Sequence, residues 1–302
     1  MKKIILVFIV FCSGILQAQK ANPKKAPVYG TMADALANEQ DATQLNLRDK
    51  KLFSVPHGLE RLHKLQYLSL MRNNLEHWDE AIFKLTDLEE INMQFNALKY
   101  VPKELANLRK LSRIELVGNN IAVLPKEIGK LTKLKNLDLS INSLTALPES
   151  IASCRELEVL ELDNNQLSYL PQSFSRLSKL QVLNLSYNQF NEIDAQWLQL
   201  TGLRELNLEY NGLQQLPEDL DALKNLKILM LNNNKLNELP YSFGSLEKLE
   251  LLSLAYNNLK TLPANLSKLK KLRTLILVGN PMSADEKMRI KRALPDCAVY
   301  TD

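Results

Sequence analysis

Few residues in this sequence have the types and spacing that catalysis or metal binding requires. The three histidines, His57, His63 and His77, follow one another at intervals of six and fourteen residues, and these intervals match no zinc-ligand pattern. The sequence contains no G-x-S-x-G, G-x-x-x-x-G-K or H-E-x-x-H motif, so it offers no candidate nucleophile or phosphate loop. We therefore predict a protein that is not an enzyme and has no cofactor and no metal.

The carboxylates are the more informative group. Glu115, Asp138 and Glu161 recur at a constant interval of 23 residues. On adjacent parallel strands their side chains would stack about 4.8 Å apart, and like charges facing each other destabilise a sheet. Their retention suggests a basic partner or a bound cation, and the alternative is an acidic face whose repulsion water and salt reduce. Calcium would be such a cation, but the sequence has no calcium-loop motif.

An internal repeat defines the elements that position these carboxylates. The pattern L-x-x-L-x-L-x-x-N-x-L appears as LQYLSLMRNNL and returns every 23 residues, without an insertion, to LRTLILVGNPM. Alternating leucines on a short strand point to one side, and only stacked copies of the unit can bury all of them in one core. Each asparagine can hydrogen-bond the backbone of its own turn and of the neighbouring rung. The asparagine column is Asn73, Asn96, Asn119, Asn142, Asn165, Asn188, Asn211, Asn234, Asn257 and Asn280.

These units resemble the leucine-rich repeat family in its 23-residue form, with L-P-x-x-I-x-x-L between strands. The resemblance covers roughly residues 42–282. It implies an α/β solenoid with a curved parallel β-sheet on the concave face, and with short helical or 3₁₀ segments and turns on the convex face. For function it implies protein–protein recognition in general.

The two ends of the chain differ from the repeats. Residues 1–18 have the layout of a secretory signal peptide, with Lys2 and Lys3 before an apolar run and Ala18 before the cut. An uncleaved anchor or a lipoprotein signal at Cys12 is the alternative. We expect a lead-in and cap helix over residues 19–41, about eleven rungs over 42–282 and a second cap over 283–302. In that cap, Met288 and Leu294 should face the core, with Ile290 at its margin.

The two remaining cysteines are predicted to be free. Cys154 occupies a leucine position of the repeat, and Cys297 lies in the cap, about six rungs or ~29 Å away. A disulfide needs Cα atoms within about 7 Å. We expect both thiols to be buried and unreactive.

The residues between the inward leucines should form the concave surface. Near its C-terminal end this surface becomes apolar and aromatic, a composition typical of interaction sites, although ordinary strand propensity is an alternative explanation. The candidate partner-binding residues are Glu115, Asp138, Glu161, Asp163, Glu205, Glu209, Tyr187, Tyr210, Ile228, Met230, Leu251, Tyr256 and Ile276.

The sequence thus predicts an exported, non-catalytic protein that binds a protein partner, which the acidic rungs suggest is basic. The formal net charge of +4 does not indicate a nucleic-acid binder. Once the signal is removed, no segment is apolar enough to span a membrane. The final location could be the periplasm, the outer surface or the medium, and the oligomeric state is open. The alternative function is a structural spacer or self-assembly component of the cell envelope.

Overall fold

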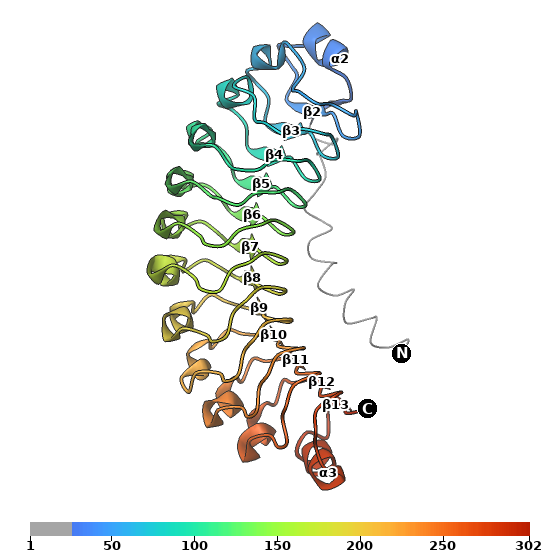
Figure 1. Ribbon diagram of the computed structural model, residues 1–302, viewed down its shortest axis with the longest axis vertical. Helices are drawn as coiled ribbons and strands as arrows, with labels where there is room; N and C mark the ends of the chain where they lie inside the picture. The colour runs from blue at the N-terminus through green and yellow to red at the C-terminus, as the bar shows by residue number, and fades with distance from the viewer. Residues whose placement is uncertain (1–25) are drawn as a thin grey trace.

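The computed structural model describes residues 26–302, so the predicted signal peptide and the first part of the lead-in lie outside the described residues. Residues 26–302 form a solenoid in which parallel strands alternate with 3₁₀ segments (Figure 1). Within residues 26–302, thirteen strands make one sheet in sequence order, from β1 to β13. The predicted fold is confirmed.

The strands and helices recur with the repeat. The strands are β1 (Val28–Tyr29), β2 (Gln44–Asn46), β3 (Tyr67–Ser69), β4 (Glu90–Asn92), β5 (Arg113–Glu115), β6 (Asn136–Asp138), β7 (Val159–Glu161), β8 (Val182–Asn184), β9 (Glu205–Asn207), β10 (Ile228–Met230), β11 (Leu251–Ser253), β12 (Thr274–Ile276) and β13 (Ala298–Tyr300). The helices are α2 (Met32–Ala37) and α3 (Ala284–Ala293). The 3₁₀ segments are η1 (Leu59–Arg61), η2 (Ile82–Lys84), η3 (Lys103–Asn107), η4 (Lys126–Lys130), η5 (Glu149–Ser153), η6 (Gln172–Arg176), η7 (Ala195–Gln199), η8 (Leu220–Ala222), η9 (Tyr241–Ser245) and η10 (Ala264–Lys268).

The strand register equals the sequence period. Leu137 on β6 pairs with Leu160 on β7, and Leu160 pairs with Leu183 on β8, each 23 residues further along. These leucines are at most 1% exposed. Burying a leucine side chain contributes about 1.5–3 kcal/mol, and the repeat supplies one such residue at the same position of each rung. The stacked leucines therefore form one continuous core along the solenoid.

The asparagine column forms the predicted ladder. Asn165 Oδ1 accepts a hydrogen bond from Leu144 N on the preceding rung at 3.0 Å. Its Nδ2 donates to Leu139 O and Leu162 O, both at 3.0 Å. A buried amide that joins two rungs in this way fixes their spacing, because each lost hydrogen bond would leave a buried polar group unpaired.

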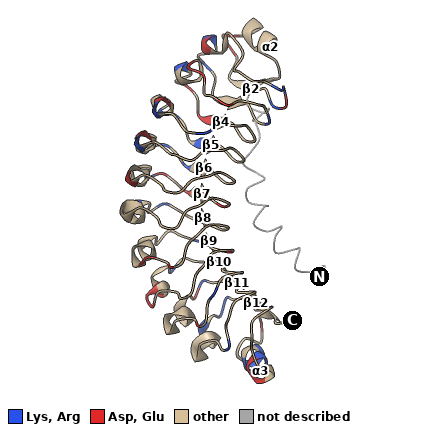
Figure 2. Ribbon diagram, viewed as in Figure 1, with Lys and Arg blue, Asp and Glu red and all other residues tan. Residues whose placement is uncertain are grey.

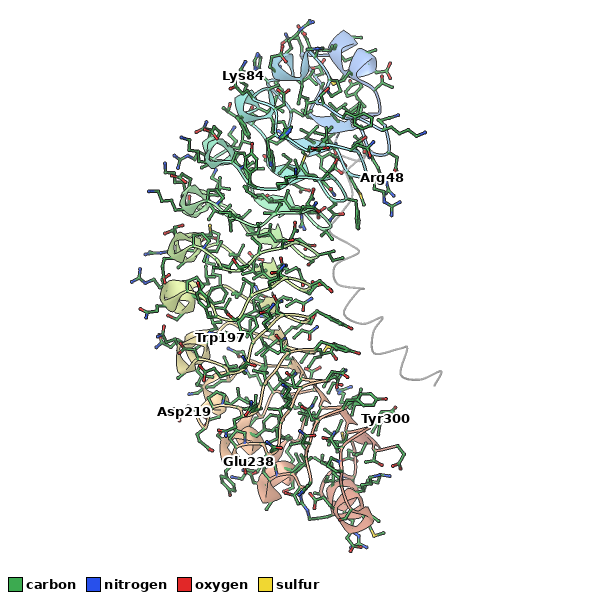
Figure 3. The ribbon with its side chains drawn as sticks, viewed as in Figure 1. Arg48, Lys84, Trp197, Asp219, Glu238 and Tyr300 are labelled. Carbon is green, nitrogen blue, oxygen red and sulfur yellow. The ribbon has the colours of Figure 1, made fainter. Side chains whose placement is uncertain are left out.

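The 3₁₀ segments lie on the outer side of the arc and the strands on its inner side (Figure 1). In Figure 3, Lys84 and Trp197 lie on the side of the 3₁₀ segments, opposite Arg48 and Tyr300. Proline precedes most 3₁₀ segments, as Pro148 precedes η5, because it fixes φ and lacks the N–H that such a segment leaves unpaired. Asp194 takes this position before η7 and caps it by accepting from Gln196 N at 2.9 Å.

The terminal helices close the ends. Thr31 caps α2 and Ser283 caps α3 through their side-chain oxygens. In α3 the predicted core contacts are partly wrong: Ile290 is fully buried and Leu294 nearly so, whereas Met288 is 51% exposed. Met288 lies two positions before Ile290, about 200° around the helix, so both cannot face the core.

The predicted burial of the cysteines is correct for one of them. Cys154 ends η5 in a leucine position and is buried, whereas Cys297 is only half-buried in the terminal rung, which has no further rung over it. Both thiols are free. Over residues 26–302, no helix combines the length and apolarity needed to cross a lipid bilayer.

Candidate partner-binding surface

The strand register brings the three repeating carboxylates together as predicted. Glu115 on β5 pairs with Asp138 on β6, and Asp138 pairs with Glu161 on β7. The alternative of a water-exposed acidic face is wrong for two of them, since Glu115 is 5% and Glu161 is 3% exposed. Side chains on the inner side of a curved sheet converge, and neighbouring rows therefore cover this column. Desolvation of these carboxylates consequently matters more than screening by salt.

Glu115 has partners that offset its burial. Its Oε2 accepts from Asn92 Nδ2 at 2.5 Å and from Gln94 Nε2 at 3.3 Å, and its Oε1 lies 3.9 Å from a guanidinium nitrogen of Arg113. Burial raises the pKa of Glu115 to about 7, although Arg113 opposes the shift. Arg113 is shared with Glu90, whose carboxylate is 3.7 Å away. Glu90 on β4 pairs with Arg113 on β5 in the strand register, and Figure 2 shows the red of acidic residues on β4 and the blue of basic residues on β5.

Asp138 and Asp163 share one hydroxyl group. Ser140 Oγ lies 2.7 Å from Asp138 Oδ1 and 2.6 Å from Asp163 Oδ1. Asp163 Oδ1 also accepts from Asn184 Nδ2 at 3.1 Å. Burial raises the pKa of Asp138 to about 6, and the hydrogen bonds from Ser140 lower it again in part. Both aspartates are half-buried, so they remain open to the concave side.

Glu161 is the least well satisfied carboxylate of the column. Among the described residues, neither of its oxygens has a hydrogen-bond partner. Burial raises its pKa to about 8, and the charge of Asp138 adds to the rise. The Asn184 amide nearby opposes the shift, but its hydrogen bond goes to Asp163. Asp138, Ser140, Glu161 and Asp163 are called the acidic cluster below.

The other two predicted carboxylates belong to later rungs. Glu205, at the start of β9, is half-buried, and burial raises its pKa while Lys227 opposes the shift. Glu209 is 4% exposed and accepts a short hydrogen bond from Asn232 Nδ2, and burial raises its pKa too. These two residues extend the acidic character toward the C-terminal rungs without joining the acidic cluster.

Two tyrosines stack beside the column. The rings of Tyr187 and Tyr210 lie 4.1 Å apart between centroids, with an angle of 11° between their planes. Both residues have left-handed backbone conformations, with φ of 53° and 51°, which bulky side chains rarely adopt. Burial, followed by the contact with Tyr210, raises the pKa of Tyr187 to about 12. The rings therefore form an ordered, partly exposed aromatic ridge.

A pocket opens on rungs β9 to β12. Met230 and Ile276 are 4% and 7% exposed and lie at its floor, while Tyr210 and Tyr256 are 40% and 58% exposed at its edge. The predicted residues Ile228 and Leu251 are half-buried but do not line it. We call this the apolar pocket, and its lining comprises Glu209, Tyr210, Met230, Asn232, Asn233, Ser253, Ala255, Tyr256, Ile276 and Val278.

Sequence reasoning missed two polar residues of this surface. Ser140 joins the two aspartates, and Asn232 Oδ1 accepts from Ser253 Oγ and Ala255 N at 2.7 Å each. Each of these residues lies two positions after the repeat position that Asp138 and Glu161 occupy, and Asp163 and Glu209 lie at the same offset. This second column was the signal that could have revealed them. In residues 26–302, no His, Cys, Asp and Glu side chains are grouped so as to hold a metal ion.

Sequence comparison identifies the repeats directly. Residues 99–209 match the leucine-rich repeat region family, and residues 63–121, 201–254 and 224–282 match the leucine rich repeat family. Together these matches cover residues 63–282, which is more than half of the chain. No match was found among curated proteins.

Solved structures share the solenoid. The ectodomain of the plant membrane receptor kinase GASSHO1/SCHENGEN3 from Arabidopsis thaliana, in complex with CASPARIAN STRIP INTEGRITY FACTOR 2, is 31% identical with a TM-score of 0.71, over 82% of this chain and 31% of that chain. An internalin (inlF) from Listeria monocytogenes is 21% identical with a TM-score of 0.72, over 87% of this chain and 81% of that chain. The leucine-rich repeat region of FLRT2, in an octameric complex with latrophilin 3 and Unc5D, is 23% identical with a TM-score of 0.71, over 84% of this chain and 88% of that chain.

This chain spans only about a third of the plant receptor structure that it matches. The repeat matches, the 23-residue strand register and the shared solenoid lead to one conclusion. The chain belongs to the leucine-rich repeat proteins.

Proposed function

We propose that this protein is an exported, non-catalytic scaffold that binds a protein partner on its concave face. The observation that carries the proposal is the pairing of an acidic cluster with an apolar pocket on the same sheet, about three rungs apart. Neither the acidic cluster nor the apolar pocket is part of the leucine core. A pre-formed surface of this kind loses little conformational entropy when it binds, because the strands are already ordered.

The composition of the surface favours a partner with basic and apolar side chains. Buried carboxylates without a full set of donors attract cationic groups, and tyrosines at the edge of an apolar pocket are frequent anchors in interfaces. Complexes of the related GASSHO1/SCHENGEN3 ectodomain and of the FLRT2 repeats support a binding role for this chain as well.

Export is the second part of the proposal. It rests on residues 1–18, which have the charged start, apolar run and small residue of a secretory signal of the bacterial style. We infer a location in the periplasm, at the outer surface or outside the cell. Fractionation of the native cells with an antibody against residues 26–302 tests this part. Retention of the protein in the cytosol would contradict it.

Site-specific photo-crosslinking tests the concave face. Benzoylphenylalanine replaces Tyr210, which is 40% exposed beside the apolar pocket, or Tyr241, which is 66% exposed on η9 at the convex side. The two substitutions are matched, since each exchanges one exposed tyrosine for another aromatic residue. Illumination in the native compartment should give a heterologous protein adduct at position 210 and little at position 241.

The same experiment separates the alternatives. An adduct with twice the mass of the chain at either position would favour a self-assembling envelope component. Equal adducts at positions 210 and 241, or an adduct at 241 alone, would contradict binding on the concave face.

A further inference from the structure

The acidic cluster has fewer hydrogen-bond donors than its carboxylate oxygens can accept from. Asp138 Oδ1 accepts from Ser140 N at 3.0 Å, and Asp163 accepts from the side-chain amides of Asn164 and Asn184 at 3.1 Å each. Ser140 Oγ carries one proton, yet it lies 2.7 Å from a carboxylate oxygen of Asp138 and 2.6 Å from one of Asp163. The hydroxyl can donate to only one of the two. The other contact joins two oxygen atoms, so it requires a proton on one aspartate or a donor from outside.

Glu161 adds to this deficit. Its two oxygens are buried and have no hydrogen-bond partner among the described residues. The charged groups that influence it, Asp138, Asp163 and Glu205, are all acidic. Over residues 26–302 no ion pair involves Asp138, Glu161 or Asp163, whereas Arg113 on β5 contacts Glu90 and Glu115.

We propose that Asp138, Glu161 and Asp163 bind the guanidinium group of an arginine side chain of the protein partner. This inference rests on the proposed function and specifies the chemistry that its acidic half recognises. A guanidinium carries one charge and five N–H donors in a planar fork, which suits several carboxylate oxygens at once. An ammonium group has only three donors and a stronger hydration shell.

The acidic cluster can be reached from the concave side, and its innermost residue is the buried Glu161. Asp138 and Asp163 are half-buried and reach the concave surface from neighbouring rungs, while Glu161, which pairs with Asp138 in the strand register, is covered. Entry of a guanidinium requires a rotation of the Glu161 side chain, a change that is common when interfaces form. The guanidinium N–H groups would donate to the carboxylate oxygens that now have no donor. Ser140 Oγ would then need to donate to only one of the two aspartates.

Binding would also displace a proton. With a pKa of about 8, Glu161 is mostly protonated at pH 7 in the free protein. A guanidinium beside it favours the charged form, so the carboxyl group loses its proton to the solvent as the ligand arrives. Arginine recognition therefore has a thermodynamic signature that an apolar contact lacks.

The test uses two small probes of nearly equal shape, N-acetylarginine amide and N-acetylcitrulline amide, which differ in the positive charge. Their binding to the purified protein at pH 7 is measured by NMR titration, and proton release by calorimetry in two buffers with different ionisation enthalpies. We expect the arginine probe to bind at least tenfold more tightly and to release about one proton per molecule bound. Equal binding of the two probes, or no detectable binding of the arginine probe, would overturn the proposal.

A pair of isosteric variants locates the site. Glu161→Gln should abolish the preference for arginine and the proton release. Glu247→Gln makes the same carboxyl-to-amide change at an exposed position outside the strands, so it should keep the preference. Asp138→Asn is the second test of the cluster and should also lose it. A preference that survives in both Glu161→Gln and Asp138→Asn would refute the assignment.

The outcome also separates this inference from the proposed function. If the crosslink at position 210 persists while the arginine preference is absent, the concave face binds its partner without a guanidinium at the acidic cluster. If both fail, the proposed function falls as well.

Discussion

The hydroxyl oxygen of Ser140 lies 2.6 Å from Oδ1 of Asp163, although the two residues are 23 positions apart in the sequence. The repeat places both residues in one column beside the strands, and the second neighbour of Ser140 is Asp138 at 2.7 Å. Such a contact is stable only if a proton or an external donor is present. This relationship connects the regular fold to the recognition that we propose for it.

Stability should fall as the pH rises toward 8. Glu161 has a pKa of about 8 in the folded chain and an ordinary value of 4.5, so between these values the folded state binds more protons than the unfolded state. The free energy of unfolding therefore decreases with rising pH, by roughly 2 kcal/mol between pH 6 and pH 8 from this group alone. Urea unfolding at several pH values measures the decrease.

The Glu161→Gln variant should lose that part of the pH dependence, because glutamine does not titrate. Glu247→Gln makes the same carboxyl-to-amide substitution at an exposed position and should keep the wild-type slope. An identical slope in the wild type and in Glu161→Gln would contradict the buried, unpaired state of Glu161.

Each asparagine of the ladder should contribute strongly to the free energy of unfolding. Asn165→Ala removes the acceptor for Leu144 N and the donor for Leu139 O and Leu162 O. Each buried group left without a partner costs about 1–3 kcal/mol, so we expect the free energy of unfolding to drop by about 3 kcal/mol. Asn107→Ala, at an exposed site in η3, is the matched control and should change it by less than about 0.5 kcal/mol. Similar losses in the two variants would argue against the ladder.

The two thiols should differ in reactivity. Burial raises the pKa of Cys154 to about 12 and that of Cys297 to about 11, and only Cys297 is partly accessible. Because the thiolate is the reactive form, a disulfide reagent should modify Cys297 slowly and Cys154 only after unfolding. Mass spectrometry of the native and urea-treated protein measures both sites. Modification of Cys154 in the native protein at the rate of Cys297 would show that its position in the core is wrong.

The distance between the acidic cluster and the apolar pocket predicts a spacing in the partner. Glu161 on β7 and Met230 on β10 are three rungs apart, or about 14 Å at the spacing of parallel strands. An extended peptide rises about 3.4 Å per residue, so an arginine and a leucine four positions apart should reach both sites. Fluorescence anisotropy should show tighter binding of such a peptide than of one with a spacing of two. Indifference to spacing would indicate that the two sites are not used together.

Much of this fold was predictable because the regularly spaced asparagines determine the strand register. Ten asparagines at a constant interval fix the register, and the register alone places Glu115, Asp138 and Glu161 on adjacent strands. The same 23-residue interval shows that Cys154 occupies a leucine position of the repeat. In a repeat protein each unit contacts its neighbours, so a local pattern determines the packing.

The exposure of the concave residues was less predictable. Strand alternation shows that Glu161 and Ile276 point away from the leucine core, but not that neighbouring columns cover them. Burial at these positions depends on the curvature of the whole sheet and on side chains of adjacent rungs. The end cap shows the same limit, since the phase of α3 buries Ile290 and exposes Met288 through contacts with the last rung that the repeat pattern does not encode.

The most direct measurement of the central claim is the affinity of the crosslinked partner for two triple variants. One carries Glu115→Gln, Asp138→Asn and Glu161→Gln on the concave face, and the other carries Glu218→Gln, Glu238→Gln and Glu247→Gln at exposed positions outside the strands. Both replace three carboxyl groups by amides of the same shape. Because burial raises the pKa of Glu115 to about 7 and that of Glu161 to about 8, the concave variant loses fewer than three negative charges at pH 7, so long-range attraction cannot explain a greater loss of affinity in that variant. We predict a loss of affinity of at least a hundredfold for the concave variant and less than threefold for the other. Equal affinities for the two variants would contradict recognition by the concave carboxylates.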